Sequence, residues 1–202
     1  MPELRLRRDD WRFGWGTLAA SARIGLTLGF QMSVIAIGAA VLQYGINHLG
    51  ADAVAAFTAA MRVDQLAVAP LASVGVAMTT YVAQNRGAGQ WARIRKGVSQ
   101  TAYLSLAVSV TVGVACIVWG KSMVRAFAGG DEHADAIIDQ AHILLVVSGL
   151  CFTSLGLLFV FRSALQGLGH SGVPTLSGVV ELILRSAVAL TLVGPLGFLG
   201  AC

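Results

Sequence analysis

The chain has 202 residues, of which 56% are hydrophobic and only 12% are charged. A soluble domain typically carries about 25% charged residues, so this composition predicts an integral membrane protein. The formal net charge of +4 does not indicate nucleic-acid binding, because the basic residues lie at the ends of apolar runs and form no patch interleaved with aromatic residues.

An amino-terminal segment, residues 1–17, precedes five apolar stretches, each long enough to cross about 30 Å of hydrocarbon as a helix. We expect these spans at about 22–48, 53–85, 96–120, 137–168 and 173–194. The second is longer than a bilayer requires and contains Pro70, which predicts a kink. The expected fold class is therefore an all-α polytopic membrane protein.

The distribution of Lys and Arg predicts the orientation in the membrane. With a cytoplasmic N-terminus, ten basic residues lie on or near the cytoplasmic side, and Lys121 and Arg125 lie outside. The ten are Arg5, Arg7, Arg8, Arg12, Arg23, Arg86, Arg93, Arg95, Lys96 and Arg162. The acidic stretch 128–139 then faces outward. This bias predicts a multi-pass protein of the cell (inner or plasma) membrane with a cytoplasmic N-terminus.

Arg62, Asp64 and Gln65 lie inside the second apolar stretch. Arg62 lies ten residues beyond Asp52, which places it roughly 15 Å into the helix and near the middle of the membrane. A charge there costs from about 2.5 to well over 10 kcal/mol, so it is expected to face the bundle interior or a wet cavity. Two interpretations are open: a cavity wall that binds a cation or substrate, and a polar clamp between helices.

Two further groups of polar residues lie within predicted spans. Glu181 and Arg185 form an i, i+4 pair in the fifth span. They predict either a self-neutralised structural pair or a glutamate that titrates during transport. Gln31, Gln43 and Asn47 form a polar stripe in the first span. This stripe is expected either to line a cavity or to join helices.

Small residues are frequent within the apolar stretches, and the chain contains 24 glycines. Gly25 and Gly29 form a GxxxG pattern in the first span. Small residues let helix backbones approach each other closely in lipid, so this pattern predicts helix packing.

The sequence holds no recognisable motif for catalysis or for binding a metal or cofactor. The three cysteines form no CxxC pattern, and the four histidines have no metal-ligand spacing. Gly87 and Gly89 do not follow a strand, so they do not predict a phosphate-binding loop. We therefore expect neither an enzyme nor a bound cofactor.

Four motifs along the chain resemble those of the multidrug and toxic compound extrusion (MATE) transporters. They are GADAVAA at 50–56, MR-x-DQLA-x-x-P at 61–70, VAQN-x-GAG at 82–89 and RSALQGLG at 162–169. The resemblance covers residues 18–202 and is to the second lobe of the family, from the seventh to the eleventh helix. It implies five of the six helices of that lobe.

The resemblance also carries functional expectations. Family members have two six-helix lobes around a central cavity and export cationic or amphipathic compounds in exchange for protons or sodium. Some members have cation-binding acids in the seventh and tenth helices, but no acid lies between Arg23 and Asp52 or between Asp139 and the end of the fourth span. The resemblance therefore assigns the role of coupling acid to no residue of this chain. Arg62, Asp64 and Gln65 match the family's eighth-helix pattern.

We expect part of a cation-coupled multidrug efflux antiporter that works by alternating access and uses protons or sodium. The expected partners are membrane lipid, cationic or amphipathic substrates and a missing N-terminal lobe. The ending GPLGFLGAC indicates a turn into a further helix, so we expect the chain to be incomplete there. The alternatives are a lipid-linked oligosaccharide flippase of the related superfamily and a non-transporting fragment or partner subunit.

Overall fold

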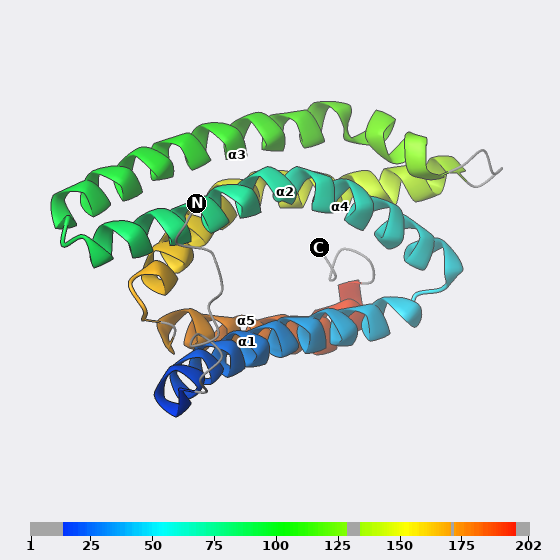
Figure 1. Cartoon of the computed structure of the whole chain (residues 1–202). Helices are drawn as coiled ribbons and strands as arrows, with labels where there is room; N and C mark the ends of the chain where they lie inside the picture. Colours follow the sequence, from blue (N-terminus) through cyan, green and yellow to red (C-terminus); the bar gives the residue numbers. More distant parts are fainter. Residues whose placement is uncertain (1–13, 129–133, 171, 197–202) are drawn as a thin grey trace, which may run out of the picture.

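The computed structural model describes residues 14–128, 134–170 and 172–196, and all regular structure within these ranges is α-helical. The five helices are α1 (Trp15–Asn47), α2 (Ala51–Gly87), α3 (Trp91–Ala128), α4 (Ala134–Gly167) and α5 (Gly172–Leu196) (Figure 1). Each predicted span overlaps one helix. Most of the predicted segment 1–17, the middle of the acidic stretch and the last residues of the chain lie outside the described residues.

The helices form a three-helix bundle and a helix pair. In the bundle, α4 packs against both α2 and α3, and α2 packs against α3. The helix pair consists of α1 and α5, which lie side by side although they come from opposite ends of the chain (Figure 1). The pair contacts the bundle much less than its two helices contact each other, mainly between α1 and α2 and between α4 and α5.

Many large apolar side chains lie on the outer surface. Leu26, Val76 and Leu150 are 75%, 70% and 70% exposed. Such a surface is unfavourable in water but suits lipid. Within the described residues, α1 to α4 are long and apolar enough to cross a membrane. The chain is thus an all-α polytopic membrane protein, as its composition predicts, while a membrane span at α5 stays a prediction.

Two apolar clusters lie in the interior of the molecule. The larger one joins the end of α1 to the bundle and includes Ile46, Phe57, Leu145 and Phe152. The smaller one lies toward the loop between α2 and α3 and contains Met78, Val82, Ile94 and Ala164. Helix α2 contributes to both clusters because it continues as one helix through Pro70.

Glycines allow α3 and α4 to pack backbone against backbone. A β-carbon built on Gly113 would lie 2.6 Å from the carbonyl oxygen of Gly149, and one built on Gly149 would lie 3.0 Å from that of Gly113. The first distance is shorter than real β-carbon contacts and the second is tighter than most of them, so this crossing requires glycine at position 113 and favours it at position 149. Close approach of this kind is how helices associate in lipid, where the hydrophobic effect does not drive them together.

The GxxxG pattern of α1 does not form such a contact. A β-carbon on Gly25 or on Gly29 would meet no atom within 4 Å. The described residues thus show no helix against this pattern, and the packing predicted for it stays a prediction. Helix α1 packs mainly against α5, through a face that does not include Gly25 and Gly29. The spacing of small residues in the sequence does not specify which face of a helix meets a neighbour.

Candidate functional site

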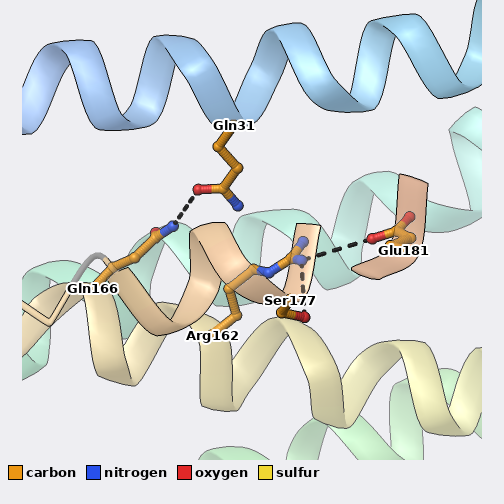
Figure 2. Close-up of polar contacts among 5 residues, drawn as sticks. All are labelled: Gln31, Arg162, Gln166, Ser177 and Glu181. Carbon is orange, nitrogen blue, oxygen red and sulfur yellow. Dashed lines mark hydrogen bonds and ion pairs between the residues drawn. The ribbon is translucent and has the colours of Figure 1, made fainter. Parts of the chain in front are cut away.

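Five polar side chains from three helices meet between the helix pair and the bundle (Figure 2). We call them the polar cluster: Gln31 of α1, Arg162 and Gln166 of α4, and Ser177 and Glu181 of α5. The guanidinium of Arg162 donates a hydrogen bond to the Ser177 hydroxyl at 3.2 Å and lies 3.6 Å from a carboxylate oxygen of Glu181. The Gln166 amide nitrogen donates to the side-chain oxygen of Gln31 at 3.4 Å.

Helical spacing explains how the cluster forms. Arg162 and Gln166 are four residues apart on α4, and Ser177 and Glu181 are four residues apart on α5. Residues at this spacing lie on the same face of a helix, about one turn apart. Two short polar rows therefore face each other where α4 and α5 meet, and Gln31 completes the cluster from α1 (Figure 2).

The cluster is largely shielded from its surroundings. Gln31 is only 2% exposed, and the side chains of Arg162 and Glu181 are 13% and 36% exposed. Burial of an unpaired charge in a membrane protein is costly, and the ion pair between these two side chains reduces that cost. The Nε of Arg162 is buried and has no hydrogen-bond partner among the described residues, so the cluster retains an unused donor.

Asp64 makes a separate polar contact within the bundle. Its half-buried carboxylate lies near the Ser148 side chain of α4. This contact between α2 and α4 is what the polar-clamp interpretation of Asp64 predicts.

Arg62 and Gln65 lie on a different face of α2 from Asp64. Both are exposed, and within the described part of the chain neither forms a hydrogen bond or an ion pair. A cavity-wall role for these two side chains stays a prediction.

The remaining predicted site residues are Gln43 and Asn47 of α1 and Glu181 and Arg185 of α5. The amide of Gln43 donates to the Asn47 side-chain oxygen at 2.9 Å, so this pair forms within α1 and is not part of the polar cluster. Glu181 lies beside Arg162, a partner from another helix. The Arg185 side chain lies outside the described residues, so its pairing with Glu181 stays a prediction.

Three members of the polar cluster were not among the predicted site residues. Arg162 was predicted only as a basic residue near the cytoplasmic side, and no site role was predicted for Gln166 or Ser177. A usable signal was present, because Arg162 and Gln166 repeat at helical spacing directly after an uncharged run. The partners on α5 were not predictable, since the sequence does not specify which faces of two helices meet.

The cluster offers donors, acceptors and one ion pair rather than catalytic groups. Within the described ranges, no three His, Cys, Asp or Glu side chains are placed to hold a metal ion. The guanidinium of Arg162 lies 3.6 Å from a carboxylate oxygen of Glu181 and compensates its charge, so the ion pair joins α4 to α5.

Comparisons with known proteins identify relatives for most of the chain. The MatE family model matches residues 27–191. The chain is similar to "Probable multidrug resistance protein NorM" of Thermotoga maritima, with 25% identity over 98% of this chain and 43% of the relative. A protein of the same name from Bradyrhizobium diazoefficiens is 27% identical over 84% of this chain and 36% of that protein. "Probable multidrug resistance protein YpnP" of Bacillus subtilis is 28% identical over 77% and 34%. The chain thus spans less than half the length of these curated relatives.

Proposed function

This chain belongs to the MatE family, and we propose that it forms one lobe of a cation-coupled multidrug efflux antiporter. The relatives that support this proposal are named for multidrug resistance. The structural observation that carries it is the polar cluster, which places an ion pair in the interface between the helix pair and the bundle. Ionisable residues at such a position in a membrane protein mark pathways for ions or substrates.

The proposed mechanism is alternating access, in which packed groups of helices move against one another around a binding site. The weak contact between the helix pair and the bundle supports such a movement. The ion pair between Arg162 and Glu181 crosses this interface and bridges α4 and α5. Binding of a proton or sodium ion to Glu181 weakens its attraction to Arg162, which favours separation of the two helices.

The proposed orientation has the N-terminus and the loop between α2 and α3 in the cytoplasm. This loop lies beside Arg86, Arg93, Arg95 and Lys96. The opposite end of α3 carries Lys121 and Arg125, which lie close to acids of α4: Lys121 is 2.8 Å from Asp139 and Arg125 is 3.8 Å from Asp135. The unbalanced basic charge is therefore at the α2–α3 loop, in agreement with a cytoplasmic location.

A flux assay tests the proposed function. The chain is reconstituted into liposomes alone and together with the N-terminal half of a MatE relative, and ethidium efflux is measured under an imposed proton or sodium gradient. We expect efflux only with both halves and only with a gradient. Gradient-independent leakage or no efflux from the combined halves contradicts the proposal, provided that the intact relative is active in the same liposomes.

Two substitutions then locate the coupling acid. Glu181→Gln in the active assembly is expected to abolish the response to the gradient, because it removes the carboxylate that carries the exchanged charge. Asp64→Asn is expected to reduce assembly stability and leave coupling intact, since Asp64 contacts Ser148 within the bundle. Asp52→Asn, at the exposed first turn of α2, serves as the matched control. Loss of coupling in Asp64→Asn alone contradicts this assignment.

A further inference from the structure

A groove lies between α2 and α3 on the side of the bundle near the loop that joins them. It has a volume of about 330 Å³ and is bounded by Ala77 and Tyr81 of α2 and by Gly97, Gln100 and Leu104 of α3, with further small and apolar neighbours. This volume lies at the lower end of the range for ligand pockets, about 300–1,000 Å³. The groove belongs neither to the polar cluster nor to the interface with the helix pair.

Tyr81 and Gly97 shape the end of the groove nearest the loop. A side chain at position 97 would collide with the Tyr81 ring, so the glycine lets the ring lie across the α3 backbone. The Tyr81 hydroxyl donates a hydrogen bond to the carbonyl oxygen of Arg93 at 3.0 Å. An aromatic ring with a tethered polar tip is the arrangement that proteins use at the boundary between hydrocarbon and headgroups.

Two basic side chains extend this wall of the groove toward the loop. Arg93 is four residues before Gly97 and lies about one helical turn beyond the groove, whereas Lys96 directly precedes Gly97 and lies at its edge, one turn from Gln100 on the same side of α3. Both are exposed. Arg93 donates one hydrogen bond to the Gln90 side chain at 2.8 Å, and Lys96 has no partner among the described residues.

We propose that the groove binds one anionic phospholipid, with an acyl chain along the apolar part and the phosphate at Lys96 and Arg93. The order of chemistry along the groove matches that of a lipid: a mostly apolar part with Gln100 and Thr101 as its polar members, then the Tyr81 ring, then two cations. The site lies between two helices that are long and apolar enough to span a membrane, so lipid is available at its opening. Basic residues between helices at a membrane surface bind anionic headgroups, and each contributes about a fivefold gain in affinity.

Lipid titration of the purified full chain in detergent tests the proposal. Phosphatidylglycerol and phosphatidylcholine with identical acyl chains are added separately, and native mass spectrometry counts the bound lipids. We expect one tightly bound phosphatidylglycerol and weaker binding of phosphatidylcholine. Lys96→Gln should weaken phosphatidylglycerol binding by about fivefold, and Ala77→Trp should weaken binding of both lipids because the indole occupies the groove.

Matched controls separate the site from general surface effects. Arg95 is exposed and lies nine residues before Leu104, on the opposite side of α3. Ala83 is exposed and lies nine residues after Val74, on the opposite side of α2 from the groove. Arg95→Gln and Ala83→Trp should leave both affinities unchanged, with helicity checked by circular dichroism for every variant.

Several results would overturn the proposal. Equal binding of the two lipids removes the role of the cations, and equal losses in Lys96→Gln and Arg95→Gln indicate a general charge effect. Unchanged binding in Ala77→Trp places the lipid elsewhere.

Absence of bound lipid, together with dimers that Ala77→Trp disrupts, identifies a second copy of the chain as the occupant. Absence of both bound lipid and dimers also rejects the lipid site. None of these results depends on transport activity.

Discussion

At the scale of single residues, the ion pair between Arg162 and Glu181 is the central feature of the chain. Its two side chains are unequally buried, at 13% and 36% exposure, and the Ser177 hydroxyl accepts a further hydrogen bond from the same guanidinium. A charge that is mostly buried depends on its partner far more than an exposed one does. Removal of either member should therefore affect both the stability of the interface and the position of α5.

A double-mutant cycle measures this interaction. Arg162→Met and Glu181→Gln should each destabilise the folded chain, and the double variant should be more stable than the sum of the two losses predicts. We expect a coupling free energy of about 1 kcal/mol, because Glu181 is partly exposed. The readout is the free energy of unfolding in mild detergent. Arg95→Met, which removes an exposed arginine of α3, is the control. A coupling energy of zero would show that the pair does not hold the helices together.

At the scale of helices, glycines have opposite roles in α3 and in α1. Gly113 lies against the backbone of Gly149, whereas a β-carbon built on Gly29 would meet no neighbouring atom within 4 Å. Both residues are glycines within apolar helices, so the sequence does not show which of them packs against another helix. The difference follows from the neighbours of each helix, since α3 packs closely on α4 while this face of α1 is open.

The two glycines should therefore respond to alanine with opposite signs. Gly113→Ala should destabilise the chain by about 1–3 kcal/mol, because the added methyl group forces α3 and α4 apart. Gly29→Ala should stabilise it by about 0.5–1 kcal/mol, because glycine is unfavourable inside a helix and no neighbour obstructs the methyl group. Thermal unfolding of the two variants in the same detergent provides the comparison. If both substitutions destabilise equally, the packing of α3 on α4 is not as close as the structure indicates.

At the scale of the whole molecule, the described helices divide into a three-helix bundle and a helix pair. The bundle is formed by helices that are consecutive in the chain, and short loops join α2 to α3 and α4 to α5. The pair is formed by the first and last helices (Figure 1). Regions with few contacts to the remainder of a protein open most readily. Relative movement of the pair and the bundle is thus the expected large motion of this chain.

Cysteine labelling tests the proposed orientation. In a variant whose three cysteines are replaced by alanine, Ser122→Cys should react with a membrane-impermeant maleimide in intact cells. Ala88→Cys, in the loop between α2 and α3, should react only after permeabilisation. Both positions are exposed, so a difference in reactivity reports the side of the membrane. The reverse pattern would place the basic loop outside and contradict the proposed topology.

The sequence by itself determined the class of protein and the family, and each span that it predicts overlaps one helix among the described residues. Long uncharged apolar stretches form helices in a membrane because every backbone group must bond within its own segment, so the stretches around Leu26, Val76 and Leu150 were predictable. The motifs from GADAVAA to RSALQGLG indicated the MATE family, which the match over residues 27–191 confirms.

Only the tertiary structure decided which polar residues meet. Glu181 was predicted to pair within its own helix, and the structure adds Arg162 of α4 as a partner. Gln31 and Gln43 appeared equivalent in the sequence, but Gln31 joins α4 and Gln43 bonds to its own helix. The physical reason is that helical periodicity specifies the neighbours of a residue along one helix, whereas contacts between helices depend on which faces meet and how close the backbones come. At the polar cluster, Gly178 of α5 lies against Gln31 and Arg162, whose nearest atoms are 3.6 Å and 3.9 Å from where a β-carbon on Gly178 would stand.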